Sequence, residues 1–162
     1  MKNLRVGTGF DVHAFAAGRD LVLGGKKIDH KQGLLGHSDA DVLIHAIMDA
    51  LLSAVSLGDI GLLFPDSSEK YKGISSINLL KEVYAMLVQA KAEIINIDAT
   101  VICESPKIYP HINDIKANIS EALGGLEPSR IGIKGTTTEK LGFTGREEGI
   151  AAQAAVLLYI NS

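Results

Sequence analysis

Several residue types that stabilise small secreted proteins are scarce in this chain. Its 162 residues include one cysteine, Cys103, and no tryptophan, and aromatic side chains make up 5% of the total. A single thiol excludes an internal disulfide framework and fits a reducing compartment. With 46% hydrophobic residues, the chain can still bury a core, built mainly from small and β-branched side chains. We therefore expect a single domain over residues 1–162.

A strong excess of charge of either sign is also missing. The net charge of -3 gives no sign of the basic excess that binds nucleic acid or an anionic membrane. No run approaches the roughly 20 apolar residues of a membrane span, and the opening MKNLRVGTGF lacks the apolar stretch of a secretory signal. We expect a cytoplasmic protein of bacterial type, with a plastid origin left open. A polyanionic substrate would need a local positive site or a metal ion.

The order of hydrophobic patterns predicts an α/β fold. Residues 4–12 alternate between apolar side chains and a face that carries Gly7, Gly9 and Asp11, which is typical of a core strand with room for an element to approach its backbone. The patterns that follow predict a hairpin turn at Gly24–Gly25, a helix capped by Ser38 and ended by Gly58, and a polar loop at 58–68. The second half of the chain predicts helices at 76–91 and from Pro110 to Gly124, and strands at 93–104 and 130–138. The last segment, at 149–160, fits either a helix or a strand. This order favours a single mixed sheet packed with helices, α/β with α+β character. The final segment is rich in alanine and aliphatic residues, which fits packing against other copies of the chain or burial within one copy.

Three polar residues form a candidate metal site. Asp11 and His13 share one face of the first strand, and His45 lies on the first helix. Together they would offer one oxygen and two nitrogens, a set that suits a divalent transition metal, zinc above all, with a fourth position open for substrate. Spacing alone leaves another interpretation open, in which Asp11 ends the strand, His13 lies in a loop and His45 is an ordinary helix histidine.

Two further segments carry groups that suit phosphates and sugars. His37 and Ser38 precede a helix, where an anion is favoured, although Ser38 also fits a simple helix cap. Asp59 and Asp66 lie in a glycine-bearing loop and suit either sugar hydroxyls or solvated turns.

The densest segment of polar groups is KGTTTEKLGFTGR, residues 134–146. Its threonines and backbone amides can hold phosphate oxygens, and Glu139 can ligate a hard cation such as magnesium. Phe143 and Arg146 could contact a ligand, or simply pack and form an ion pair. The bland alternative is a threonine-rich loop with Glu139 in solvent.

Five motifs in order resemble one family. They are GFDVHAF, GLLGHSDADVLIHA, LGDIGLLFPD, ESPKIYPHI and KGTTTEKLGFTGREEGIA, and they are similar to those of the 2-C-methyl-D-erythritol 2,4-cyclodiphosphate synthases. The resemblance covers nearly the whole chain. Gly135 and Cys103 depart from it, since alanine or another small residue is common at both positions, and both lie near the expected cytosine pocket.

The resemblance implies a homotrimer with active sites between neighbouring subunits. It implies zinc, or another divalent transition metal, at Asp11, His13 and His45, and Mg²⁺ or Mn²⁺ bound by Glu139 and the substrate diphosphate. His37 and Thr137 match positions credited with transition-state stabilisation. Substrate contacts are implied for Asp11, Val12, His13, His37, Ser38, Asp59, Ile60, Gly61, Phe64, Pro65, Asp66, Ser67, Ser68, Cys103, Glu104, Ser105, Pro106, Lys107, Ile108, Tyr109, Thr136, Thr137, Thr138, Glu139, Phe143 and Arg146.

The implied reaction is the cyclisation of 4-diphosphocytidyl-2-C-methyl-D-erythritol 2-phosphate, with release of CMP, in the non-mevalonate isoprenoid pathway. Two other functions remain open. A metal-dependent phosphohydrolase would use metal-bound water, but the extra carboxylates and histidines of a two-metal site are missing. A trimeric module could bind isoprenoid diphosphates in a cavity bordered by Phe143 and Arg146.

Overall fold

The computed structural model describes residues 3–65, 68–71 and 73–161. It is built on a five-stranded mixed sheet with the strand order β4-β1-β7-β5-β6 and a separate two-stranded hairpin, β2-β3. The strands are β1 (Leu4–Ala16), β2 (Leu21–Leu23), β3 (Lys26–Ile28), β4 (Gly33–Leu34), β5 (Ala92–Ile102), β6 (Ile131–Thr136) and β7 (Gly149–Ile160). The helices are α1 (Val42–Ala54), α2 (Ile60–Leu63), α3 (Ser76–Gln89), α4 (Ile112–Ala122) and α5 (Gly142–Gly145), with 3₁₀ turns at Glu69–Tyr71, Tyr109–His111 and Pro128–Arg130. The predicted mixed sheet packed with helices is confirmed.

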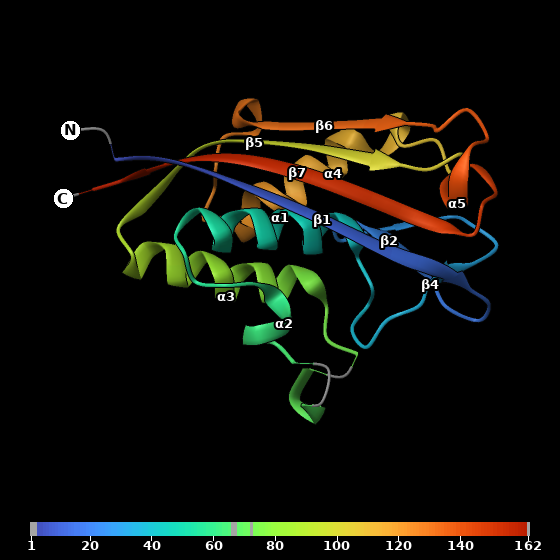
Figure 1. Ribbon diagram of the computed structural model, residues 1–162, viewed down its shortest axis with the longest axis horizontal. Helices are drawn as coiled ribbons and strands as arrows, with labels where there is room; N and C mark the ends of the chain where they lie inside the picture. The colour runs from blue at the N-terminus through green and yellow to red at the C-terminus, as the bar shows by residue number, and fades with distance from the viewer. Residues whose placement is uncertain (1–2, 66–67, 72, 162) are drawn as a thin grey trace.

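The sheet is antiparallel except at one edge, where β5 and β6 run parallel. Helices α1 and α3 lie on one side of it (Figure 1). The segment at 149–160, which fits helix or strand by pattern, is the central strand β7. Both chain ends lie together at one end of the sheet, opposite α5 and β4 (Figure 1), where the amide of Ile160 donates a hydrogen bond to the carbonyl of Asn3.

Helix α1 packs very closely against β1 because two glycines leave space for it. A Cβ atom added to Gly7 would lie 1.9 Å from the carbonyl oxygen of Ala50, and one added to Gly9 would lie 2.0 Å from that of Ala46. The small residues on both elements let the two backbones touch. The prediction that the glycines leave room for an approaching element is confirmed, and α1 is buried on nearly all sides.

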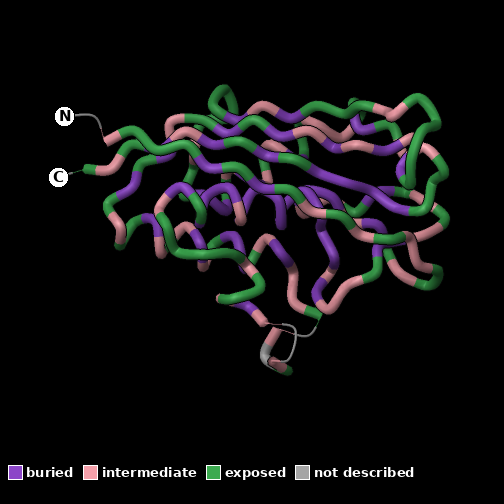
Figure 2. Tube along the Cα trace, viewed as in Figure 1, coloured by how far each residue is buried: buried purple, intermediate pink, exposed green. Residues whose placement is uncertain are grey.

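The apolar face of β1 is a correction to the sequence analysis. Val6 and Phe10 are 71% and 59% exposed, and Leu4 and Val12 are exposed as well, so this face points away from the core. The periodicity identifies a strand but does not say which face is covered. Here the glycine face meets α1, and the apolar face joins the open side of the sheet, where exposed segments recur along the strands (Figure 2).

The start of the first helix is a second correction. Asp41, not Ser38, is the N-cap of α1, and its side chain accepts a hydrogen bond from the amide of Ile44 at 3.1 Å. Ala40 has a left-handed backbone with φ 56°, which interrupts any helix that starts at Ser38. The Ser38 hydroxyl instead accepts a bond from the amide of Ala40. The predicted polar loop at 58–68 also contains the short helix α2.

Candidate functional site

The end of β1 and the first turn of α1 bring three ligand-type side chains together. Asp11 Oδ2 lies 3.0 Å from His13 Nε2 and 3.0 Å from His45 Nδ1, and the two imidazole nitrogens are 3.1 Å apart. The cluster follows from the close packing of β1 on α1. Asp11 and His13 continue the strand face that carries Gly7 and Gly9, so their side chains point toward the same helix. The predicted candidate metal site of Asp11, His13 and His45 is present in the structure.

The donor set fits a divalent transition metal. Tetrahedral zinc with bonds of about 2.0–2.1 Å holds its ligand atoms about 3.4 Å apart, which is close to the separations observed. His13 Nδ1 donates a hydrogen bond to the carbonyl of Leu35 at 2.6 Å, so its Nε2 atom is the one that faces the cluster. Metal-bound histidines usually have such a partner on the second nitrogen.

The charges of Asp11 and His13 are set by burial and by the hydrogen bonds within the cluster. Burial raises the pKa of Asp11, but hydrogen bonds from His13 and His45 outweigh it, so the pKa is well below its usual range. Burial lowers the pKa of His13, but the hydrogen bond with Asp11 outweighs it and the pKa is raised above 6.5. The cluster therefore offers an ionised carboxylate, and a metal must displace a proton from His13.

A pocket of about 370 Å³ opens above the cluster. It is lined by Asp11, His13, Gly36, His37, Ser38, His45, Ile60, Gly61, Phe64, Pro65, Tyr71 and Leu79. The expected phosphate contacts His37 and Ser38 thus lie beside the metal candidates. Asp59 is exposed and caps α2, where its carboxylate accepts a bond from the amide of Leu62 at 2.8 Å.

Two other residues expected in this half of the site do not line the pocket, and two more are outside the described residues. Asp66 and Ser67 fall outside the described residues. Val12 lies on the open face of β1 and Ser68 precedes a 3₁₀ turn, and neither lines the pocket.

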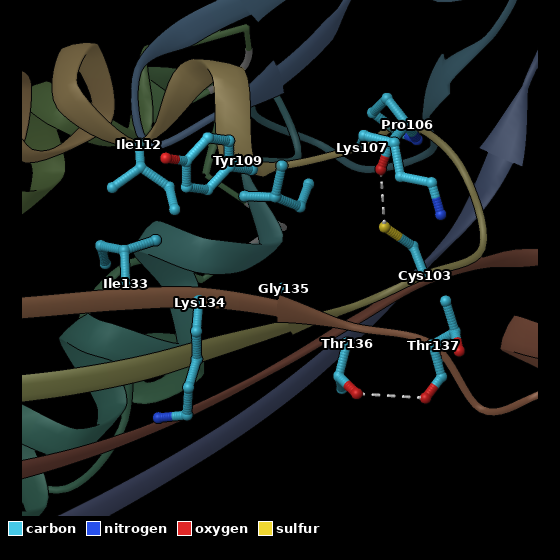
Figure 3. Close-up of a pocket in the computed structure, with 11 residues that line it drawn as sticks. Cys103, Pro106, Lys107, Tyr109, Ile112, Ile133, Lys134, Gly135, Thr136 and Thr137 are labelled. Atoms are coloured by element: carbon cyan, nitrogen blue, oxygen red, sulfur yellow. Dashed lines mark hydrogen bonds between the residues drawn. The ribbon is translucent and has the colours of Figure 1, made fainter.

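A second pocket, of about 450 Å³, lies at the parallel edge of the sheet. Its lining comprises Cys103, Pro106, Lys107, Ile108, Tyr109, Ile112, Ile133, Lys134, Gly135, Thr136 and Thr137. Figure 3 shows the apolar side chains of Tyr109, Ile112 and Ile133 at one end and the two threonines at the other. Cys103, Pro106, Lys107, Ile108 and Tyr109 belong to the segment in which the family resemblance predicts the cytosine pocket.

The two residues that depart from the family pattern both line this second pocket. The Cys103 thiol donates a hydrogen bond to the carbonyl of Pro106 at 3.4 Å, and burial raises its pKa to about 11. A Cβ atom on Gly135 would lie 3.0 Å from the side chain of Ile108. Glycine therefore lets Ile108 pack directly on the strand.

The threonine-rich loop is held from outside the pocket. The Glu104 carboxylate accepts hydrogen bonds from the amides of Thr138 and Lys140 at 3.2 and 3.1 Å, so it fastens the loop. The Thr137 hydroxyl donates to the Glu139 carboxylate at 2.9 Å, and Glu139 has a left-handed φ of 52°. The expected cation ligand is thus beside the expected transition-state residue, and far from the Asp–His–His cluster in the sheet.

Other predicted contacts of this half are not pocket residues. Glu104, Ser105, Thr138 and Glu139 do not line the second pocket. Phe143 is exposed, and the guanidinium of Arg146 pairs with the carboxylate of Glu148 at 2.9 and 3.1 Å.

The two pockets lie beside different strands of the sheet, β1 and β6. In the strand register, Asp11 is opposite Ala152, which is opposite Val101, which is opposite Gly135. Three strand spacings amount to about 14 Å. Among the described residues the two linings have no member in common.

One contact of the cluster was missed by the sequence analysis. The Ser76 hydroxyl, at the start of α3, lies 3.0 Å from His45 Nε2. Ser76 is separated from His45 by 31 positions, and nothing in its local sequence indicates a role in the site. Only the packing of α3 against α1 reveals the contact.

Fold and site together define an α/β protein with a candidate divalent-metal centre between β1 and α1 and a second pocket beside β6. The chain matches the YgbB family model over residues 4–159 and belongs to this family. The 2-C-methyl-D-erythritol 2,4-cyclodiphosphate synthase of Geobacillus sp. (strain WCH70) is 56% identical over 95% of this chain and 97% of the relative. The enzyme of the same name from Alkaliphilus metalliredigens (strain QYMF) is 58% identical over 94% of this chain and 96% of the relative.

Solved structures agree with these relatives. The bifunctional IspDF of Campylobacter jejuni superposes with a TM-score of 0.95 and 44% identity over 100% of this chain. This chain spans only 44% of that longer protein. The IspF of Plasmodium falciparum, solved as a CDP complex, has a TM-score of 0.87 and 34% identity, and the match covers 100% of this chain and 99% of the other.

Proposed function

We propose that this chain is a 2-C-methyl-D-erythritol 2,4-cyclodiphosphate synthase of the non-mevalonate isoprenoid pathway. It cyclises 4-diphosphocytidyl-2-C-methyl-D-erythritol 2-phosphate and releases CMP. The observation that carries the proposal is the Asp11, His13 and His45 cluster at the base of a pocket that also holds His37 and Ser38. Near full-length relatives that bear this name support it.

The reaction needs charge suppression and orientation more than a protein nucleophile. An oxygen of the 2-phosphate forms a bond to the β-phosphorus, and the bond from that phosphorus to the bridging oxygen breaks. The bridging oxygen keeps the electron pair and leaves as part of CMP. Because nucleophile and electrophile belong to one molecule, holding the folded substrate for in-line attack supplies much of the rate.

The Asp–His–His cluster is the proposed site of zinc or another divalent transition metal. A bound metal would supply Lewis-acid polarisation of a phosphoryl oxygen. Beside it, His37 and Ser38 would donate hydrogen bonds to phosphate oxygens and fix their direction. These two side chains share the pocket with the three candidate ligands, which supports the assignment.

The threonine loop is the proposed second phosphate-binding element. Thr136, Thr137 and Thr138 would bind the diphosphate, with Thr137 placed to stabilise charge in the transition state. Glu139 would hold Mg²⁺ or Mn²⁺ together with the diphosphate oxygens. The 2.9 Å hydrogen bond between Thr137 and Glu139 supports a joint role.

Residues 103–109 would form the cytidine site. The second pocket contains Cys103, Pro106, Lys107, Ile108 and Tyr109, and its apolar wall is suited to a flat base. A neighbour of the same fold is described as a CDP complex, which supports a cytidine nucleotide as ligand.

We further propose a homotrimer in which the metal pocket of one subunit faces the cytidine pocket of the next. Two observations support it. Asp11 of the metal pocket and Gly135 of the cytidine pocket lie on strands about 14 Å apart by strand spacing, and the open face of β1 exposes Leu4, Val6 and Phe10. A continuous hydrophobic core between the sheet and its helices supports treating residues 1–162 as one domain.

Two remaining expectations belong with this proposal. An isoprenoid diphosphate would bind near Phe143 and Arg146, and its apolar tail could use the exposed apolar residues of β1. Farnesyl diphosphate binding, compared between the parent and Arg146→Ala, tests this.

A cytoplasmic location is supported by the bacterial biosynthetic relatives. No helix in the described part of the chain is long and apolar enough to cross a membrane.

A product assay tests the main proposal. The substrate is incubated with metal-loaded protein, and the products are separated and identified by mass. Equimolar CMP and cyclic diphosphate are expected, and Asp11→Ala should abolish nearly all of both. Uncyclised, hydrolysed phosphate products would instead identify a phosphohydrolase.

A further inference from the structure

The imidazole of His45 has a partner on each side. Its Nδ1 atom faces Asp11 and His13. Its Nε2 atom faces two serine hydroxyls, that of Ser76 at 3.0 Å and that of Ser38 at 3.2 Å. A ligand nitrogen at Nδ1 requires the proton on Nε2. One N–H group therefore has two candidate acceptors.

The two serines differ in how they are held. The Ser76 hydroxyl donates to Asp39 Oδ1 at 2.5 Å, and the Ser76 amide donates to Asp39 Oδ2 at 3.0 Å. Ser76 is fully buried. Its hydroxyl proton is thus committed to a carboxylate, and its oxygen can only accept from His45.

Ser38 is bound less rigidly at its hydroxyl. Its oxygen accepts a bond from the amide of Ala40 at 3.1 Å, and the residue lines the metal pocket. Its hydroxyl proton faces no carboxylate among the contacts of the described residues. Ser38 can therefore turn its proton toward an anion in the pocket, whereas Ser76 cannot.

We infer that Ser76 and Asp39 are positioning residues that, once a metal replaces the hydrogen bond from His45 Nδ1 to Asp11, hold His45 with its proton on Nε2 and its Nδ1 lone pair toward the metal. They also free Ser38 from that task, so Ser38 can leave His45 and donate to a phosphate of the substrate. The first part rests on the metal site alone, and the second rests on the proposed function. Partners of metal-bound histidines typically change metal affinity by 10- to 100-fold when removed.

Zinc affinity of the metal-free protein tests the first part without any substrate. Dissociation constants are measured by competition with a chromogenic chelator for the parent, Ser76→Ala, Ser75→Ala and Asp11→Ala. Ser75 is the matched control, since it neighbours Ser76 and its side chain makes no capping bond. Ser76→Ala should weaken zinc binding about tenfold, whereas Ser75→Ala should stay within about twofold of the parent.

One further variant and two further measurements separate positioning from folding. Asp39→Asn, which keeps the shape but weakens the acceptor, should weaken zinc binding in the same direction. Thermal unfolding of the metal-free forms shows whether each variant is folded. In zinc-loaded protein labelled with ¹⁵N-histidine, the His45 Nε2 proton should exchange with water faster in Ser76→Ala or Asp39→Asn than in Ser75→Ala.

Inorganic phosphate tests the second part. Zinc-loaded Ser38→Ala should bind phosphate at least about tenfold more weakly while keeping the parent's zinc affinity within about twofold. Equal zinc affinity in Ser76→Ala and Ser75→Ala would overturn the inference, as would a zinc loss in Ser38→Ala as large as that in Ser76→Ala. Unchanged zinc binding in Asp11→Ala would count instead against the metal site and the proposed function.

Discussion

The single thiol of the chain illustrates how a pocket residue can be chemically quiet. Cys103 lines the second pocket, yet burial raises the pKa of its thiol to about 11 and its proton points to the carbonyl of Pro106. Thiolate is the reactive form of cysteine. Cys103 therefore contributes shape to the pocket and no nucleophile.

Alkylation measures this directly. At pH 8 the reaction of Cys103 with iodoacetamide should be at least about 100-fold slower than that of a free thiol, because so little thiolate is present. Unfolding in urea should restore the ordinary rate and serves as the internal control. An ordinary rate in the folded protein would show that the thiol is accessible and ionised.

Protons and metal compete at His13. Its pKa is raised above 6.5, since the hydrogen bond with Asp11 outweighs the lowering effect of burial. Asp11, with its lowered pKa, stays ionised at all but strongly acidic pH. The metal must therefore displace one proton, from His13.

Zinc affinity should consequently fall as the pH falls through the pKa of His13, beginning above pH 6.5. Displacing one proton predicts a loss of about tenfold per pH unit on the acidic side. Chelator competition between pH 5.5 and 8.5 measures the profile. A constant dissociation constant across this range would contradict the ligand role of His13.

At the scale of elements, the contact between β1 and α1 determines the site. Asp11 follows two positions after Gly9, whose Cα faces the carbonyl of Ala46, the residue next to His45. The contact at Gly9 thus fixes the position along β1 and α1 at which the Asp11 carboxylate meets the His45 imidazole.

Gly9→Ala should be severely destabilising. The new Cβ would lie 2.0 Å from a backbone oxygen, so the helix must shift, at a cost of at least about 3 kcal/mol. Urea unfolding measures the loss. Thr8→Ala is the matched control, since Thr8 is the exposed neighbour and should change stability by less than about 1 kcal/mol.

Much of the fold could be predicted because period and capping are local signals. The strand at β1, the hairpin at Gly24–Gly25 and the helix at α3 follow their patterns closely. The start of α1 could not be predicted, because Ser38 and Asp41 are both good caps and only the left-handed Ala40 decides between them.

The candidate site divides in the same way. Asp11, His13 and His45 could be found as candidates because alternation in a strand and one helix face restrict where they point. Spacing alone left another interpretation open, and the five family motifs in order favoured the metal site. Ser76 and the Glu104 contact with the loop could not, since each joins segments far apart in the chain. Such contacts depend on packing, for which the sequence offers no periodic signal.

At the scale of the whole molecule, the proposed homotrimer would account for both the open face of β1 and the separation of the two pockets. The apolar residues of β1 are exposed in a single chain, and the metal pocket and the second pocket lie beside β1 and β6, three strand spacings apart. A head-to-tail ring would cover the first and join the second, since such interfaces match two different patches.

Subunit mixing tests this arrangement. Asp11→Ala and Thr137→Val each damage a different half of the site and should be nearly inactive alone. Trimers assembled from equal amounts of both should recover about a quarter of parental activity, because a quarter of the interfaces pair two intact halves. No recovery, with mixed trimers demonstrated by mass spectrometry, would place the whole site within one subunit.

The placement of the two chain ends has a practical consequence. They lie together at the end of the sheet opposite α5 and β4 (Figure 1), joined by the hydrogen bond between Ile160 and Asn3. Exposed ends are where proteins best accept additions. An affinity tag, a fluorescent protein or a second enzyme can therefore be attached at either end without reaching either pocket, and a short bridge between the ends would give a circularly permuted protein.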